Sequence, residues 1–357
     1  MLVFIGTYTA SASRGVYAFR FDLATGQASA PWLAVETRSP TFLALAPGQR
    51  RLYATGELRL EDVAGKPAGG VTAYAIDAEA GKLTELNHKA TGGNATTHGV
   101  VDATGRTVIT VNYHAGYVCA LPIGPDGRLG DPATLIEHRG PLGPNQARQN
   151  TSHPHSTTLS PDNRFALVCD LGLDRILVYR LDPTKAALTP NQPPFGTAPA
   201  GAGPRHSKFS KDGRFFYALN EMGGTICAYT FEALHGILGL RQTISTLPAG
   251  FTGENGAAGI RLHPNDRFVY ASNRGHDSLA VFARDPESGT LELVEIVPCG
   301  GRHPRNFALT PDGRWLLCAN RESDNVVIFK VDPASGGLTP TGGVVSVPEA
   351  VCVLFLG

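Results

Sequence analysis

The chain has 357 residues, 42% of them hydrophobic, so it is long enough for two ordinary domains or one large domain built from repeats. Its formal net charge is zero. A neutral chain has no overall basic field, which argues against nucleic acid and anionic membranes as partners. The many glycines and prolines, 42 and 26, are typical of a protein with many turns.

The cysteines and the first residues bear on the compartment. None of the six cysteines forms a CxxC pair or a zinc-type spacing, and most lie in apolar, strand-like runs. Such cysteines are typical of buried thiols in a reducing compartment. The opening MLVFIGTYT enters a strand at once, without signal-peptide features, and no apolar run is long enough for a transmembrane helix. We therefore expect a cytoplasmic protein.

In chain order, the first predicted elements are strands at Met1–Thr9, Gly15–Asp22 and Pro31–Thr37. From there a unit of about 50 residues recurs six times. Each unit contains a tight turn ending in arginine, an apolar strand, a third strand and a weaker fourth. The turns read APGQR (46–50), DATGR (102–106), SPDNR (160–164), SKDGR (210–214), HPNDR (263–267) and TPDGR (310–314).

Radial repetition of four-stranded units of this size predicts an all-β, seven-bladed β-propeller with antiparallel strands in each blade. The C-terminal run Val351–Leu356 supplies the missing first strand of the blade formed by residues 1–37. We expect one domain over residues 1–357, as a monomer or weak homo-oligomer. Glu232–Leu240 is predicted to be at most a short helical turn. Longer loops are predicted at Glu57–Gly70, Gly140–Ser152, Asn191–Gly203 and Ala249–Gly256.

One repeat, Gly201–Gly224, carries an unusual set of side chains. The turn at Lys211–Arg214 joins two predicted strands, so the residues that open the first strand lie beside those that close the second. Arg205 and His206 are thereby placed next to Glu221. One guanidinium, one imidazole and one carboxylate are predicted at one end of this hairpin.

The repeats serve as an internal control, because residues present in every copy serve the scaffold. The turn arginines recur and are interpreted as structural: Arg106, Arg164, Arg214, Arg267 and Arg314. At the opposite ends of the same strands the copies differ, and these ends surround the mouth of a propeller's central channel. Polar groups that converge in one pocket are the usual hypothesis for a binding site.

The mouth positions give two groups of candidates. We predict four catalytic residues from matched positions in different copies: His155, Arg205, Glu221 and Arg274. We predict five substrate-binding neighbours: His153, His206, Asn273, Arg305 and Glu254. No metal and no cofactor are expected at this site, and no nucleophile elbow or nucleotide-binding motif is present.

The same residues resemble a known family, the seven-bladed β-propeller lactonases of the 6-phosphogluconolactonase type. The resemblance covers essentially the whole chain and is most specific in GPRH with the following NE, and in NRGHDS. It implies hydrolysis of 6-phosphogluconolactone to 6-phosphogluconate without a required metal. A related branch cyclises muconates with one His, two Arg and one Glu, which correspond by motif to His155, Arg205, Arg274 and Glu221.

The residue types agree with lactone hydrolysis, which needs a base for the attacking water and positive charge for the oxyanion. A guanidinium also suits an anionic substrate. Either His155 or Glu221 is the base on sequence grounds. We keep two alternatives: a muconate-type cycloisomerase, and a non-catalytic propeller that binds another protein. The polar mouth argues against the latter.

Overall fold

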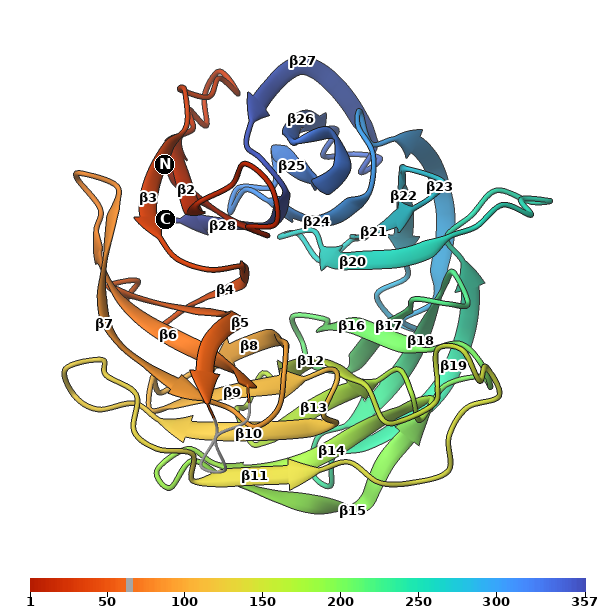
Figure 1. The fold of residues 1–357 in the computed structure, drawn as a ribbon. Helices are drawn as coiled ribbons and strands as arrows, with labels where there is room; N and C mark the ends of the chain where they lie inside the picture. The colour runs from red at the N-terminus through yellow and green to blue at the C-terminus, as the bar shows by residue number, and fades with distance from the viewer. Residues whose placement is uncertain (62–66) are drawn as a thin grey trace.

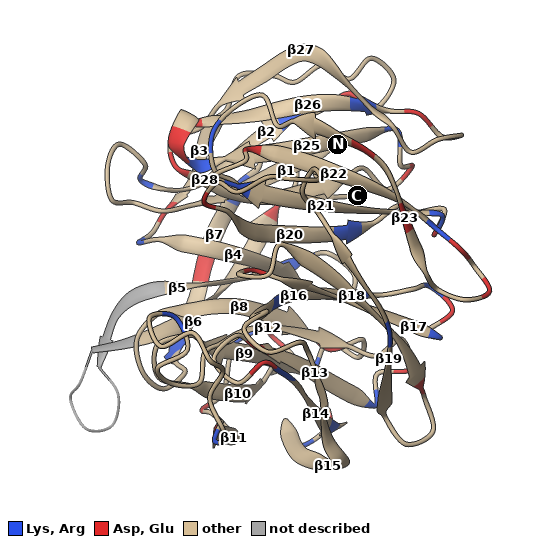
Figure 2. Ribbon diagram, turned by 90° about the vertical axis from the view of Figure 1, so that its right-hand side faces the viewer, with Lys and Arg blue, Asp and Glu red and all other residues tan. Residues whose placement is uncertain are grey.

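The computed structural model describes residues 1–61 and 67–357 and consists of seven four-stranded antiparallel sheets arranged in a ring (Figure 1). This confirms the predicted seven-bladed β-propeller. The innermost strand of each blade lines the central channel, and the strands then run outward in order. Basic and acidic residues are interspersed along the side of the ring, in keeping with the neutral composition (Figure 2).

The shared blade has the spatial order β28 (Ala350–Leu356), β1 (Leu2–Thr7), β2 (Gly15–Arg20) and β3 (Trp32–Glu36). The other blades, each from the innermost strand outward, are β4 (Pro40–Leu45), β5 (Arg51–Glu61), β6 (Pro67–Asp77), β7 (Lys82–Ala90); β8 (Thr96–Val101), β9 (Thr107–Asn112), β10 (Tyr117–Pro122), β11 (Thr134–Glu137); β12 (Pro154–Leu159), β13 (Phe165–Asp170), β14 (Arg175–Asp182), β15 (Ala187–Thr197); β16 (Pro204–Phe209), β17 (Phe215–Asn220), β18 (Thr225–Glu232), β19 (Ile237–Ser245); β20 (Gly256–Leu262), β21 (Phe268–Arg274), β22 (Ser278–Arg284), β23 (Leu291–Pro298); β24 (Pro304–Leu309), β25 (Trp315–Asn320), β26 (Asn325–Val331) and β27 (Leu338–Ser346).

The ring closes through the two chain ends. β28 pairs antiparallel with β1, from Leu2 opposite Leu356 to Thr7 opposite Ala350. The N- and C-termini therefore lie close together in Figure 1. The predicted closure by Val351–Leu356 is confirmed, and it leaves the first blade without an unpaired inner edge.

The recurring turns are held by their own side chains. In the turn at 160–164, Ser160 Oγ donates to Asp162 Oδ1 at 2.5 Å and accepts from the Phe165 amide at 3.0 Å. Arg164 Nε pairs with Asp162 Oδ2 at 2.7 Å, and Arg164 Nη2 donates to the carbonyl of Ala233 in the next blade. These contacts fix the turn and tie adjacent blades together, which agrees with a structural role for the turn arginines.

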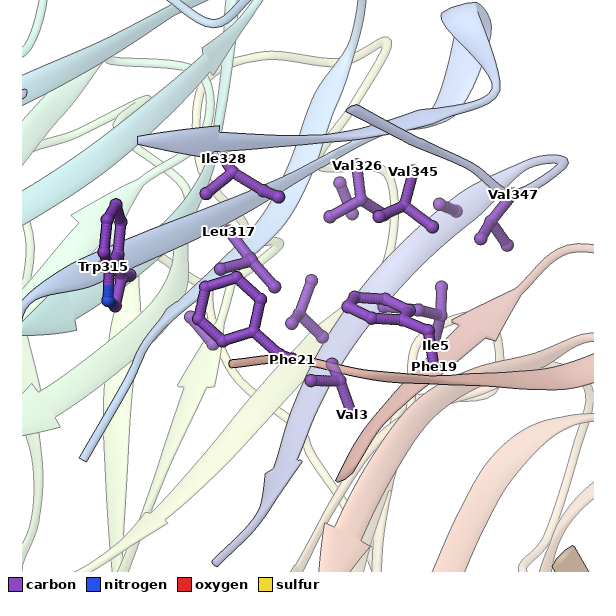
Figure 3. Packing of buried hydrophobic residues seen from close by; sticks show 14 residues of the cluster. Val3, Ile5, Phe19, Phe21, Trp315, Leu317, Val326, Ile328, Val345 and Val347 are labelled. Atoms are coloured by element: carbon purple, nitrogen blue, oxygen red, sulfur yellow. The ribbon is translucent and has the colours of Figure 1, made fainter. Parts of the chain in front are cut away.

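Apolar side chains pack between the blades rather than in a single central core. The described residues form seven buried clusters, one at each blade interface. Figure 3 shows the cluster beside the shared blade, where Phe21 and Trp315 meet edge to face with ring centroids 6.1 Å apart. Trp315 Nε1 also donates to the carbonyl of Leu23 at 2.9 Å. Each blade is thus stabilised mainly by its two neighbours.

Several predicted connections are corrected. β5 continues to Glu61 and β6 begins at Pro67, so much of the expected loop Glu57–Gly70 is strand, and its residues 62–66 lie outside the described part. β15 runs on to Thr197, into the expected loop Asn191–Gly203, because backbone pairing with β14 resumes at Phe195 after a register shift. Within Glu232–Leu240, residues 233–236 form the turn between β18 and β19 and the rest are strand, so the expected helical turn is absent there. Within residues 1–61 and 67–357, no helix is long and apolar enough to cross a membrane.

A register shift near the mouth recurs in the innermost strand of all seven blades. Such a β-bulge leaves one residue unpaired and redirects its side chain. In β20 the shift falls between Ala257 and Ile260. In the other blades the extra residues are Thr41, Thr97, His155, Arg205, Arg305 and Val351.

Candidate active site

The hairpin of β16 and β17 places Arg205 beside Glu221, as predicted. Pro204 pairs with Asn220, so the bulged Arg205 and the residue after β17 lie at the same end of the sheet. Arg205 Nε donates to Glu221 Oε2 at 2.8 Å. Arg205 is only 1% exposed, and its Nη1 donates to the carbonyl of Ala258 in the adjacent blade. This guanidinium is therefore fixed in position inside the protein.

Two further guanidinium groups reach the same carboxylate. Arg274, the last residue of β21, lies with Nη2 3.0 Å from Glu221 Oε2, and its Nε donates to the carbonyl of Gly256 at 2.8 Å. A Cβ at Gly256 would lie 2.9 Å from Arg274 Nη2, so the glycine makes room for this guanidinium. Arg148 Nη2 donates to Glu221 Oε1 at 2.5 Å from the loop between β11 and β12.

The Glu221 carboxylate is ionised although it is buried. Burial raises its pKa, but the guanidinium groups of Arg274 and Arg205 outweigh burial and hold the pKa well below the usual 4.5. Both carboxylate oxygens accept hydrogen bonds or ion pairs from arginine. Because three guanidinium groups face one carboxylate, the cluster keeps an excess of positive charge. A carboxylate held in this way is a weak base and a strong positioning group.

Within residues 1–61 and 67–357, His155 is the imidazole that comes within 4 Å of the Glu221 carboxylate. Its Nε2 lies 3.9 Å from Glu221 Oε2, which is beyond hydrogen-bond distance, and its buried Nδ1 has no partner among the described residues. Burial, and then the charge of Arg205, lower its pKa well below 6.5. His155 is therefore neutral near pH 7, and its Nδ1 is both buried and unpaired in the described part of the chain.

An aromatic layer lies beneath these groups along the channel. The His206 ring is 5.3 Å from that of His155 and 5.4 Å from that of His98, and Phe42 packs on His98 at 3.9 Å. His206 Nε2 lies 3.2 Å from Arg205 Nη1, so it contacts the site from below. Tyr113 approaches His155 edge-on at 5.5 Å. These rings hold His155 in a largely dry environment.

A pocket of about 610 Å³ opens over the cluster at the channel mouth. This volume suits a small metabolite. The buried Glu221, the partly buried Arg274 and Arg148 line it, whereas the buried His155 and Arg205 are not part of the lining. The full lining is Asn145, Arg148, Glu221, Met222, Glu254, Asn255, Gly256, Arg274, Gly275 and His303.

The substrate-binding predictions divide into two groups. Glu254 lines the pocket, and Arg305 lies partly buried at the mouth with its guanidinium 5.4 Å from the Tyr8 ring. No hydrogen bond or ion pair engages Arg305 among the described residues. Next to it, burial, Arg274 and Arg305 lower the pKa of His303 to about 3. His303 lines the pocket, so a neutral imidazole and a free guanidinium stand side by side at the mouth.

The structure does not place His153 and Asn273 at the pocket. His153 stacks on Tyr113 with ring centroids 4.4 Å apart, and its Nδ1 bonds to the Tyr113 carbonyl at 2.9 Å. Asn273 is fully buried and exchanges hydrogen bonds with Thr246, at 2.7 Å to its Oδ1 and 2.8 Å from its Nδ2. Both side chains serve the packing of their own blades.

Arg148 was missed by sequence reasoning. It lies in the predicted loop Gly140–Ser152, within the connection between β11 and β12, which is longer than the other connections between blades. It is the only charged residue of that loop, and this was the available signal. Among the described residues, no three His, Cys, Asp or Glu side chains are grouped as metal ligands.

Comparisons with known proteins agree with this architecture. Residues 2–355 match the family described as "Lactonase, 7-bladed beta-propeller". The chain is 36% identical to a 6-phosphogluconolactonase of Bacillus subtilis over 99% of this chain and 97% of that protein. It is 30% identical to a 6-phosphogluconolactonase of Formosa agariphila over 86% of each. A periplasmic gluconolactonase of Pseudomonas aeruginosa superposes with a TM-score of 0.93 at 35% identity, over 100% of this chain and 99% of that one.

Proposed function

The chain belongs to the seven-bladed β-propeller lactonase family, and on that premise we propose that it hydrolyses 6-phosphogluconolactone to 6-phosphogluconate at the pocket over Glu221. The observation that carries this proposal is the pairing of a neutral, unpartnered His155 with a carboxylate held by three arginines. It combines a free base with an excess of positive charge, the two requirements of ester hydrolysis.

In the proposed mechanism, His155 takes a proton from a water that attacks the lactone carbonyl carbon. The carbonyl oxygen becomes an oxyanion, which the guanidinium of Arg274 stabilises from the pocket lining. The tetrahedral intermediate then collapses, the ring C–O bond breaks, and the departing alkoxide takes the proton back from His155. The product is an open-chain hydroxy acid, with a carboxylate beside the arginines.

Glu221 is proposed as a positioning residue rather than the base. Its low pKa makes it a poor proton acceptor, whereas its contacts orient Arg205 and Arg274. The sequence left the choice between His155 and Glu221 open, and the neutral imidazole of His155 with its unpaired Nδ1 supports the histidine.

The anionic end of the substrate is assigned to Arg148 and Arg305. The Arg148 side chain is 45% exposed, so it is able to move from Glu221 to an incoming phosphate. Arg305 has no hydrogen bond or ion pair within the described residues and is already free. Arg205, by contrast, is buried and held by two partners, which makes it a poor clamp for a mobile ligand.

The substrate is tested with a panel of 6-phosphogluconolactone, unphosphorylated gluconolactone and a muconolactone, each corrected for hydrolysis in buffer. The proposal expects the highest kcat/KM for the phosphorylated lactone, and a loss of this preference in Arg305→Met. Equal rates on both gluconolactones would leave a lactonase without a phosphate requirement. Activity on the muconolactone alone would favour the cycloisomerase alternative, and no rate above buffer would favour a binding module.

We also propose a cytoplasmic location. All six cysteines are buried and unpaired, which supports a reducing compartment. Detection of the protein in the membrane-free soluble fraction after removal of the periplasm would test this.

A further inference from the structure

A second pocket of about 610 Å³ lies at the other end of the central channel, near the recurring turns. Ala103, Ser160 and Asn163 mark its rim, and Phe42 and His98 lie toward the mouth. Two cationic side chains line it, Lys208 of β16 and Arg261 of β20. Nothing in the mechanism above uses either residue.

The two cations occupy one register position in adjacent blades. Lys208 pairs with Tyr217 and Arg261 pairs with Tyr270. Each tyrosine is the third residue of the second strand of its blade. The corresponding residues of the other five innermost strands are uncharged: Ala44, Val100, Thr158, Ala308 and Leu354. Because the scaffold repeats without a charge here, the scaffold does not need Lys208 and Arg261.

These charges lack counter-ions. Among the described residues, Lys208 Nζ has no hydrogen bond or ion pair, and Arg261 donates only to the carbonyl of Ile260 at 2.9 Å. Within the described part of the chain, no acidic side chain lines the pocket. Asp102, next to the lining residue Ala103, is committed to the amides of Thr104, Arg106 and Thr107. Two unpaired, partly buried cations close to each other cost stability unless something neutralises them.

The pKa of Lys208 also indicates a cation without a counter-ion. Burial, and then the charge of Arg261, lower its pKa from 10.5 to about 7. Lys208 and Arg261 also help to lower the pKa of His98, after burial. An anion between the two side chains would relieve this repulsion.

We propose that the turn-side end of the channel is a second ligand site, in which Lys208 and Arg261 bind the charged end of a small organic dianion, a phosphate monoester or dicarboxylate. The apolar side chains around them, including Phe42, Phe209 and Phe355, accommodate its carbon skeleton. The site is distinct from the mouth, because the rings of His98 and His206 lie between it and His155. It does not depend on the proposed lactonase activity.

The test uses the intact protein and isothermal titration with inorganic phosphate, malonate and, as a monovalent control, chloride at matched ionic strength. Lys208→Gln and Arg261→Gln remove the site. Arg267→Gln removes an exposed arginine of the same hairpin as Arg261 that is not part of the pocket lining, and it serves as the matched control. Arg305→Met separates any phosphate bound at the mouth from phosphate bound at this site. We expect each dianion to bind the parent and Arg267→Gln with Kd values that differ less than twofold. Each channel variant should weaken binding at least tenfold, and the relative affinities of phosphate and malonate identify the preferred headgroup.

A second measurement separates ligand binding from structural damage. In chloride buffer, Lys208→Gln should melt at the same temperature as the parent or higher, because an unpaired, partly buried charge has been removed. Phosphate should raise the melting temperature of the parent more than that of the variant. The proposal is overturned if phosphate binds parent and channel variants equally, if Arg267→Gln weakens binding as much as the channel variants do, if Arg305→Met alone loses all binding, or if neither dianion binds the parent.

Discussion

Arg148 donates a hydrogen bond to Glu221 Oε1 at 2.5 Å from a loop 73 residues earlier in the chain. Glu221 is 5% exposed, whereas the Arg148 side chain is 45% exposed. One partner is therefore fixed in the fold, and the other is at the edge of solvent. This asymmetry makes Arg148 the arginine of the cluster best placed to exchange its partner for an anionic substrate.

Arg148→Met is accordingly expected to act on substrate binding. KM for a phosphorylated lactone should rise about tenfold or more, with a smaller effect on kcat, because a clamp contributes mainly to binding. KM for unphosphorylated gluconolactone should change less. Steady-state kinetics on both lactones measure the difference. Arg139→Met is the matched control, since Arg139 is exposed and paired with Glu137 outside the pocket. An equal effect of the two substitutions would contradict the assignment.

Substitution of a turn arginine and of a mouth arginine should have different effects on stability and on activity. Arg164→Ala removes an exposed pair with Asp162 and should change the free energy of unfolding by about 1 kcal/mol or less, with kcat/KM unchanged. Arg274→Ala removes a partner of Glu221 and should lower kcat about 10²–10³-fold. Denaturant melts and kinetics of both variants provide the comparison. An inactive but folded Arg164→Ala, with an active Arg274→Ala, would mean that the two faces are assigned backwards.

The pH dependence of kcat/KM reports the base in the free enzyme. His155 must be neutral to accept a proton, and burial together with Arg205 holds its pKa well below 6.5. Its active form therefore persists below pH 6.5. An unperturbed histidine would lose about tenfold in kcat/KM between pH 7.5 and 5.5.

We expect a nearly flat profile over that range with gluconolactone, which carries no titrating phosphate. A midpoint at or above pH 6.5 would show that His155 is not the base, or that its environment differs from the one described.

Closure of the ring by β28 gives a prediction about stability. Deletion of Val351–Gly357 removes the partner of β1 and exposes a sheet edge, so we expect aggregation or a large fall in melting temperature. Deletion of Gly357 alone is the control, because it removes only the contact of its amide with Gln49. Thermal melts and size-exclusion chromatography distinguish the two. An unchanged melting temperature in the longer deletion would contradict closure by this strand.

The repeat made the fold predictable from sequence. Its turns recur with arginine at a fixed place, and the apolar run Val351–Leu356 supplies the inner strand that residues 1–37 lack. The predicted blade order and shared blade follow from that pattern alone. The loops were less predictable, because strands such as β15 continue past prolines when a register shift allows pairing to resume.

The site was only partly predictable. Comparison of the repeats found His155, Arg205, Glu221 and Arg274, because charged residues replace neutral ones at the mouth. The same comparison also put His153 among the substrate-binding neighbours, whereas its ring stacks on Tyr113 outside the lining of the pocket. The direction of a side chain near the mouth depends on the β-bulge, which puts His155 and Arg205 out of the alternation. Arg148 could not be placed, since its loop has no repeat to set its conformation.

Removal of the His155 imidazole tests the central claim most directly. The measurement is kcat for 6-phosphogluconolactone hydrolysis above the buffer rate, in the parent and His155→Gln. His114→Gln is the matched control, because His114 is exposed at the end of a neighbouring blade's second strand. We expect kcat to fall about 10²–10⁴-fold in His155→Gln and to stay unchanged in His114→Gln. A folded His155→Gln that hydrolyses the lactone as fast as the parent would contradict the account.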